Sequence, residues 1–230
     1  MISFIIPTYN EKGNLATLLL ALQSIAKKND EFIFIDDSSP DGTGELIASE
    51  AKKDSRIHLI RREGKQGLAS AYFRGLTEAR QDLIVLIEAD FPPTAEHLRK
   101  IEQGFLSGAA EVLSSRFIKG GGTKVGILRG FGSRIVNAIG ALYLGVPIKD
   151  FGNALRGIRR DVFLKIKDQI TQFTHPEFFT QLTYLIYKNK GTLVCFPVVS
   201  IKRTYGVSKT DKLLKAAFRY FRNLKKIKYS

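Results

Sequence analysis

Residues 83–87 read Leu-Ile-Val-Leu-Ile, a strand with no polar face. A strand that is apolar on both faces must be covered on both faces, as in a parallel sheet between two layers of helices. Short, mainly apolar runs recur at 2–6, 31–35 and 57–60, a further strand is expected at 111–115, and segments of helical periodicity separate the strands. This alternation predicts an α/β fold with a doubly wound, mostly parallel sheet and helices on both faces.

The predicted helices divide the chain into a part where helices and strands alternate and a part, after residue 120, where helices predominate. Four of them alternate with the strands, at residues 14–26, 44–53, 67–80 and 94–105. After a Gly-rich loop at 120–122, we expect helices at 127–144 and 176–189, a strand at 192–201 and a basic helix at 210–228. We therefore predict one domain over residues 1–230, with a first half at 1–119, a second half at 120–209 and a basic amphipathic C-terminal helix at 210–230.

The charge of the chain points to an anionic partner. The formal net charge is +14 over 230 residues, which favours nucleic acid, an anionic membrane surface or a phosphorylated substrate. A lone cysteine, Cys195, allows no disulfide within the chain and suits a reducing cytoplasm. Pro7 interrupts the first apolar run, so no signal peptide is expected, and no run reaches the roughly 18 apolar residues of a spanning helix.

Charged and polar residues follow the predicted strands where each strand ends. Ligands of open α/β sheets bind beyond the carboxyl ends of the strands, so these residues would converge on one crevice. They are Asn10 and Glu11 after the first strand, Asp36 and Asp37 after the second, Glu88 and Asp90 after the fourth, Arg116 after the fifth and Arg203 after the last.

Two of these strand ends carry paired carboxylates. Glu88 and Asp90 are separated by one residue, so in extended chain both would point to the same side and could share a divalent cation that also binds phosphate. One of Asp36 and Asp37 is expected to bind a base or ribose, and the other to brace the Pro-Asp-Gly turn. The segment 64–67 precedes a helix that either faces an anion or follows a simple turn.

Several motifs resemble known enzymes. The segments IIPTYNE at 5–11, IDDSSPDGT at 35–43 and GLASAYFRGL at 67–76 resemble glycosyltransferase family 2. Within that family, SSRFIKGGG at 114–122, DFGNALRG at 150–157 and RTYGVSK at 203–209 are similar to dolichyl-phosphate mannose synthases. The resemblance implies a GT-A fold, the fold of nucleotide-diphospho-sugar transferases, and inverting transfer of a sugar to a polyprenyl or dolichyl phosphate, with mannose and a GDP-mannose donor favoured.

The resemblance also implies roles for single residues. The first half would bind the nucleotide sugar and the second half the acceptor. The donor nucleoside would be held by Pro7, Tyr9, Glu11, Phe34 and Asp36. Ala89 and Asp90 would lie by the donor phosphates, and Glu88 and Asp90 would bind Mg²⁺ or Mn²⁺. Arg116, Arg203 and Lys209 would bind phosphate oxygens and, with Asp90, form the catalytic group, while Arg156 would help to place the acceptor.

Three positions depart from the family pattern. The usual Asp-x-Asp is Glu88-Ala89-Asp90, and Pro92 stands where the family often supplies a metal ligand. The segment 151–155 replaces much of the acceptor motif, which leaves the sugar and the acceptor open. A phosphate acceptor is already ionised near neutral pH, so it needs positioning and charge screening rather than a general base.

The C-terminal helix has two interpretations. Its apolar positions recur at helical spacing and lysine and arginine fill the rest, which suits a helix in the interface of an anionic leaflet. The same stripe could pack on the domain itself. The first interpretation predicts a cytoplasmic protein, peripheral on the cytoplasmic face of the membrane, with an anionic membrane surface as partner and a separate membrane subunit left open.

Other functions remain open within these limits. A UDP-sugar donor with another sugar or acceptor is the main alternative, and a protein that binds a nucleotide sugar with low activity is another. Nucleic acid is suggested by charge alone, because no known module that interleaves basic residues with exposed aromatics is present, so we expect no nucleic-acid partner.

Overall fold

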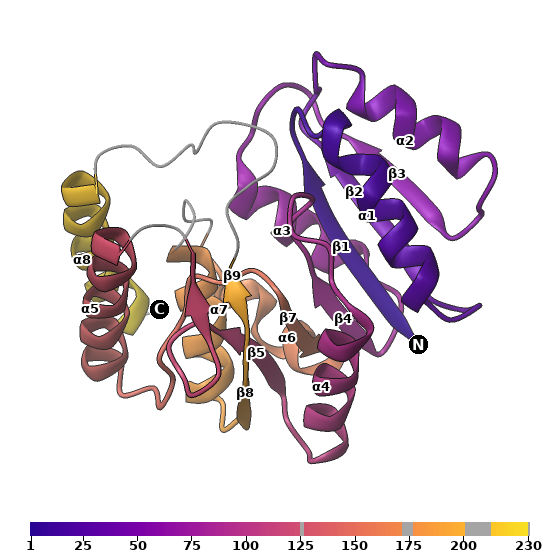
Figure 1. The fold of residues 1–230 in the computed structure, drawn as a ribbon. Coiled ribbons are helices and arrows are strands. Elements are labelled where there is room, and N and C mark those ends of the chain that lie inside the picture. The colour runs from indigo at the N-terminus through magenta and orange to yellow at the C-terminus, as the bar shows by residue number, and fades with distance from the viewer. Residues whose placement is uncertain (125–126, 172–176, 201–212, 230) are drawn as a thin grey trace.

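The computed structural model describes residues 1–124, 127–171, 177–200 and 213–229, apart from the side chains of 127–129 and 213–217. A seven-stranded sheet with the order β3-β2-β1-β4-β7-β5-β8 forms its centre (Figure 1). The strands are β1 (Ile2–Thr8), β2 (Glu31–Asp36), β3 (Ile57–Arg61), β4 (Leu83–Leu86), β5 (Glu111–Ser115), β7 (Arg156–Arg159) and β8 (Leu193–Pro197). Only β7 runs antiparallel to its neighbours.

The remaining elements surround this sheet. The helices are α1 (Lys12–Ile25), α2 (Thr43–Ala51), α3 (Leu68–Glu78), α4 (Ala95–Leu106), α5 (Ile127–Leu144), α6 (Arg160–Ile166), α7 (Glu177–Lys188) and α8 (Leu213–Lys228), with a short 3₁₀ turn at Lys167–Gln169. A small parallel pair is formed by β6 (Gly122–Thr123) and β9 (Val199–Ser200). The α/β class and the mostly parallel sheet predicted from the sequence are thus confirmed.

Alternating residues of the central strands feed two cores, one on each face of the sheet. Phe4 and Phe32 point to the face covered by α1 and α4, where Leu15 and Ile101 are buried. Their neighbours in the strands point to the opposite face, where Ile5 packs with residues of α3, α6 and α7. This alternation is the period of an extended strand, and it explains why these strands have no polar face.

A third core lies at the β5–β8 end of the sheet. It joins α5 and α8, which lie together at one end of the molecule in Figure 1. Tyr220, Leu224 and Ile227 of α8 are buried in it. The apolar stripe of the C-terminal helix therefore packs on the domain along these residues, which favours the second of its two interpretations.

The second half of the chain differs most from the sequence-based expectation. The predicted strand at 192–201 ends at Pro197 as β8, and Val199–Ser200 pair with β6 instead. No strand was expected at Arg156–Arg159, yet this segment lies between β4 and β5 as β7. One sheet therefore contains strands from both sides of residue 120, while the division into donor and acceptor halves stays a prediction.

None of the helices in the described part of the chain is both long and apolar enough to cross a membrane.

The packing of α8 leads to a stability prediction. Leu224→Ala should lower the free energy of unfolding by about 2–5 kcal/mol, because it leaves a cavity in the third core. Phe218→Ala is the matched control on the same helix, since Phe218 is 73% exposed, and it should change stability by less than about 0.5 kcal/mol. Urea unfolding measures both, and equal losses would mean that α8 is not anchored through Leu224.

Candidate active site

The carboxyl ends of the parallel strands lie along one edge of the sheet. At this edge β1 leads into Tyr9–Glu11, β2 into Asp37–Ser39, β4 into Glu88–Asp90 and β5 into Arg116. The parallel registers of β1 with β2 and with β4 bring the first three segments to neighbouring positions. The edge therefore gathers the carboxylates and Arg116, which were expected in one crevice, while Arg203 lies outside the described residues.

Asp36 braces the loops that follow β1 and β2. Its carboxylate accepts hydrogen bonds from Thr8 Oγ1 (3.0 Å), Ser39 N (3.0 Å) and Ser39 Oγ (2.6 Å). Ser39 Oγ accepts in turn from Asn10 N at 3.0 Å, and Thr43 Oγ1 accepts from Glu11 N at 3.0 Å. Asp36 is buried and its hydrogen bonds lie within the protein. Its contact with the nucleoside therefore stays a prediction.

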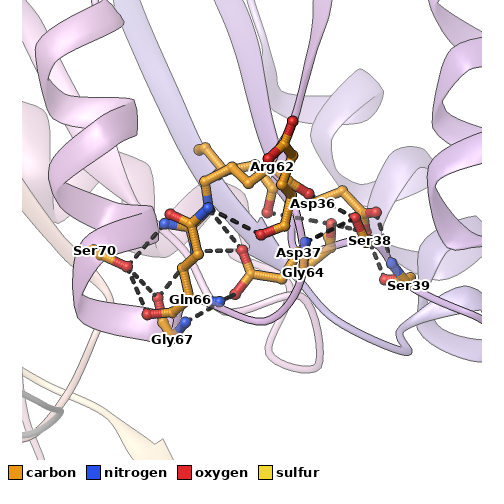
Figure 2. Close-up of polar contacts among 12 residues, drawn as sticks. Asp36, Asp37, Ser38, Ser39, Arg62, Gly64, Gln66, Gly67 and Ser70 are labelled. Carbon is orange, nitrogen blue, oxygen red and sulfur yellow. Dashed lines mark hydrogen bonds and ion pairs between the residues drawn. The ribbon is translucent and has the colours of Figure 1, made fainter.

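Asp37 holds the segment that precedes α3 (Figure 2). Its carboxylate forms a buried ion pair with Arg62 and accepts hydrogen bonds from Gln66 N (3.1 Å) and Gly67 N (3.0 Å). Arg62 donates onward to Ser70 Oγ at 2.8 Å and to Gly67 O at 3.1 Å. The start of α3 therefore faces an anion, and that anion is the protein's own Asp37.

The nucleoside residues implied by the resemblance separate into two groups. Tyr9 and Glu11 are half-buried; Lys65 Nζ lies 4.4 Å from the centre of the Tyr9 ring, and Glu11 Oε2 accepts a hydrogen bond from Asn14 Nδ2 at 2.7 Å. Pro7 and Phe34 are buried in their strands. Phe34 is wrong as a contact residue, because its side chain is fully enclosed in the core beneath α1.

The acidic pair lies in a turn rather than in a strand. β4 ends at Leu86, and Phe91 N donates to Glu88 O at 3.1 Å to close a turn around Ala89 and Asp90. The expectation that Glu88 and Asp90 point to the same side of an extended chain is therefore wrong in its premise, because the chain turns between them. Both are half-buried while Ala89 is buried, so the two carboxylates reach the edge of the sheet and Ala89 offers only its backbone.

The acidic turn offers a partial metal site. Glu88 and Asp90 supply the hard oxygen ligands that Mg²⁺ and Mn²⁺ accept. Within the described ranges of the chain, no cluster of three or more His, Cys, Asp or Glu residues is arranged to hold a metal. These residues fit a cation only if other oxygens, such as those of a phosphate or water, complete its coordination.

Arg116 is a cation at this edge, and Asp150 fixes its position. Asp150 is fully buried; its Oδ2 accepts from Arg116 Nε at 2.8 Å and from Arg116 N at 3.0 Å, and its Oδ1 accepts from Arg116 Nη2 at 2.8 Å. Burial alone would lower the pKa of Arg116, but the hydrogen bond and charge of Asp150, with the charge of Glu88, raise it. Arg116 keeps 21% of its side-chain area exposed, so a bound anion can still reach it.

Arg156 lies below this site and is fully buried. Its Nη1 donates to Glu111 Oε1 at 2.9 Å and to Thr183 Oγ1 at 3.0 Å. Its Nη2 donates to Phe151 O at 2.8 Å and to Asn153 O at 2.5 Å. Arg156 cannot touch an acceptor directly, so its predicted help in placing one would act through the backbone of 151–153.

Two of the predicted phosphate-binding residues, Arg203 and Lys209, lie outside the described residues. Three residues that sequence reasoning did not assign to the site contribute to it: Asp150, Arg62 and Lys65. Asp150 opens the DFGNALRG segment that carried the family resemblance, which was the available signal. No local pattern marks Arg62, because its partner Asp37 is brought to it only by the pairing of β2 with β3.

The fold and this arrangement of residues define a class of protein. Residues 3–167 match the model of glycosyl transferase family 2, and the chain belongs to that family. It is accordingly a glycosyltransferase, and its sheet has the GT-A arrangement.

Among known proteins, the chain is similar to polyprenyl-phosphate enzymes. It is 33% identical over 210 residues to the polyprenol monophosphomannose synthase of Mycolicibacterium smegmatis, covering 89% of this chain and 79% of that protein. It is 28% identical over 212 residues to the undecaprenyl-phosphate mannosyltransferase of Micrococcus luteus, covering 89% and 85%. With the dolichol-phosphate mannosyltransferase of Pyrococcus furiosus, 37% identity extends over 121 residues, 52% of this chain and 34% of that protein.

Solved structures agree on the fold. Glucosyl-3-phosphoglycerate synthase from Mycobacterium tuberculosis, in complex with Mn²⁺, UDP and phosphoglyceric acid, superposes with a TM-score of 0.72 at 16% identity. The match covers 99% of this chain and 78% of that chain. The same enzyme with Mg²⁺ and UDP gives a TM-score of 0.71. At this level of identity the likeness shows the fold alone.

The Asp37 brace leads to a prediction about stability. Asp37→Ala should lower the free energy of unfolding by about 3–5 kcal/mol, because it leaves the buried Arg62 without its charge partner. Glu45→Ala is the matched control, since Glu45 pairs with the neighbouring Arg61 in an exposed ion pair and its loss should hardly shift the midpoint of unfolding. Thermal unfolding distinguishes the two, and similar shifts would contradict the bracing role.

The Arg116–Asp150 pair leads to a prediction about turnover. Asp150→Asn should lower kcat by on the order of 100-fold while the variant stays folded, because Arg116 loses one charged acceptor and shifts from its position. KM for the sugar donor should change less than kcat, since the donor motifs lie on other strands. Asp161→Asn, at an exposed pair with Lys165, is the control, and unchanged kcat in folded Asp150→Asn would contradict the assignment.

Proposed function

We propose that the chain transfers a sugar from a nucleotide-sugar donor to a polyprenyl or dolichyl phosphate with inversion at the anomeric carbon. The observation that carries this proposal is Arg116, which is partly exposed and is fixed by the buried Asp150 beside the acidic turn at Glu88. A guanidinium held in this way can bind a phosphate, and the buried Asp150 keeps it in position when the phosphate binds. The relatives named as polyprenol-phosphate and undecaprenyl-phosphate mannosyltransferases support the lipid acceptor.

The proposed chemistry needs no general base on the protein. The acceptor phosphate is ionised near neutral pH, and its oxygen attacks the anomeric carbon opposite the departing nucleoside diphosphate. Arg116, with Arg203 and Lys209, screens the repulsion between donor and acceptor phosphates. Tyr9 and Glu11 hold the nucleoside, while Pro7, Phe34 and Asp36 shape its surroundings from within the protein.

Glu88 and Asp90 would hold Mg²⁺ or Mn²⁺ together with donor phosphate oxygens. A divalent cation bound there offsets the negative charge of the leaving diphosphate. Ala89 adds its backbone to the same turn. Arg156 acts on the acceptor through the 151–153 segment, in line with the division into a donor half at 1–119 and an acceptor half at 120–209.

Mannose from GDP-mannose is the favoured donor substrate, because the named relatives are mannosyltransferases. A UDP-sugar is the alternative, which the UDP-bound neighbours of the same fold make worth testing. The favoured location is the cytoplasmic face of a membrane, where a separate membrane subunit is a further candidate partner. Nucleic acid is not proposed as a partner.

The test is a transfer assay with both donors. Radiolabelled GDP-mannose and UDP-glucose are each incubated with the chain, polyprenyl phosphate and Mg²⁺ or Mn²⁺, and lipid-extractable label is counted. Label from GDP-mannose supports the favoured proposal, and label from UDP-glucose alone supports the alternative. Donor binding without transfer from either would overturn the proposed activity.

The acidic turn leads to a prediction that uses the same assay. Asp90→Asn should lower transfer by on the order of 100-fold at saturating metal, because a neutral amide is a weak metal ligand, while the fold is retained. Glu88→Asp should retain activity, since it keeps the carboxylate and changes its reach by one methylene. Near-normal turnover of Asp90→Asn, or a folded but inactive Glu88→Asp, would contradict the metal assignment.

A further inference from the structure

Helix α5 exposes apolar side chains although it already packs against the domain on its other side. Asn137 and Leu144 are buried, and a Cβ on Gly140 would lie 2.5 Å from Tyr220 Oη of α8. On the outer side, large apolar residues recur at intervals of three and four: Phe131, Ile135, Ile139 and Leu142, with exposures of 64%, 44%, 45% and 86%. No part of the chain that the structure describes covers this outer face, and an exposed apolar patch of this kind marks a surface that meets a protein or a membrane.

The surroundings of this face are cationic. Arg134 is exposed between Phe131 and Ile135, and neither α5 nor α8 contains an aspartate or glutamate. Lys228 of α8 lies against the end of α5, where its Nζ donates to Tyr143 O at 3.0 Å and lies 4.6 Å from the Tyr143 ring. The exposed residues of α8 add two phenylalanines and further cations: Phe218, Phe221, Arg222, Lys225 and Lys226.

We propose that the outer face of α5 docks into the interface of an anionic lipid bilayer, and we call it the α5 face (Phe131, Ile135, Ile139 and Leu142). An amphipathic surface of this kind buries its apolar side chains at the level of the headgroups while flanking cations contact anionic lipid. A second copy of the chain fits less well. A twofold contact through the α5 face would bring the cations of both copies together with no acidic residue of either helix to meet them.

The α5 face is connected to the candidate active site through short contacts. Asn137, on the inner side of α5, accepts a hydrogen bond from Phe151 N at 2.7 Å through its Oδ1. Phe151 follows Asp150, which fixes Arg116. Docking through α5 would therefore hold the Arg116 end of the site near the membrane surface. This step deepens the proposed function and rests on it, because it takes the acceptor phosphate to belong to a lipid in that membrane.

The test is flotation of the full chain with vesicles of phosphatidylcholine containing phosphatidylglycerol. Ile135→Ser combined with Leu142→Ser should lower the partition coefficient by about tenfold or more, because the favourable free energy of transferring both apolar side chains into the membrane interface is lost. Leu20→Ser with Leu106→Ser is the matched control, since these leucines are 68% and 87% exposed on α1 and α4, and it should float like the unmodified chain.

The contribution of the α8 cations to lipid binding is measured in parallel. Lys225→Gln with Lys226→Gln should weaken binding to anionic vesicles, and added salt should weaken the binding of the unmodified chain. If the α5 variant and the Leu20/Leu106 control float alike, the proposal is overturned. It is also overturned if the unmodified chain does not float and sedimentation shows a dimer that the α5 variant dissociates, because the face then covers a second copy.

Failure of the docking proposal is distinguishable from failure of the proposed function. The α5 variant should transfer sugar to a short-chain, water-soluble isoprenyl phosphate at the rate of the unmodified chain, while transfer to long-chain acceptor in vesicles falls with flotation. Flotation that depends on the α5 face without transfer to either acceptor would overturn the function and leave the docking surface. Transfer to both acceptors at unchanged rates in the α5 variant would overturn the docking surface and leave the function.

Discussion

The ion pair between Arg156 and Glu111 is fully buried, and much of the candidate site depends on it. Burial raises the pKa of Glu111, while the charge and hydrogen bonds of Arg156 and the hydrogen bond of Thr183 oppose that rise. An arginine without solvent is stable only where protein atoms replace its water, and the carbonyls of Phe151 and Asn153 do this for Nη2. The same bonds fix the segment that follows Asp150, so the geometry of Arg116 is set from the core upward.

On the opposite side of the site, buried carboxylates rather than a buried arginine hold the loops in place. Asp36 and Asp37 are buried carboxylates: Asp36 accepts hydrogen bonds from Thr8 Oγ1 and from Ser39 N in the loop that follows it, and Asp37 accepts from Gln66 N and Gly67 N in the loop after β3. The loops after β1, β2 and β3 are thereby tied to one another before any ligand arrives. A site that binds a multiply charged donor benefits from such fixed dipoles, because no free energy is then lost in ordering the loops during binding. Between these two rigid sides lies the turn with Glu88 and Asp90.

Elements of the fold that a local sequence pattern specifies could be predicted from the sequence. The run at 83–87 predicted a buried strand, because a strand without a polar face has only one environment available. β7 was not predicted, since Arg156–Arg159 carries arginine at both ends. Its place in the middle of the sheet depends on Glu111 of β5, which pairs with the buried Arg156. The strand-end residues that the structure describes lie at one edge as expected, but their burial did not follow from the sequence. Phe34 and Asp36 proved internal, because depth below a surface is decided by the helices that cover the sheet.

Helices α5 and α8 exchange the roles that their composition suggests. α8 has the stronger alternation of apolar and basic residues, yet its stripe at Tyr220, Leu224 and Ile227 is used in the third core. α5 is the more uniformly apolar helix, and that surplus leaves an apolar face after its inner side is buried against α8. The basic face of α8 then remains available to contact anionic lipid beside the α5 face. On this proposal the two helices form one docking surface, in which α5 supplies the apolar contact and α8 both supports α5 and supplies the charge.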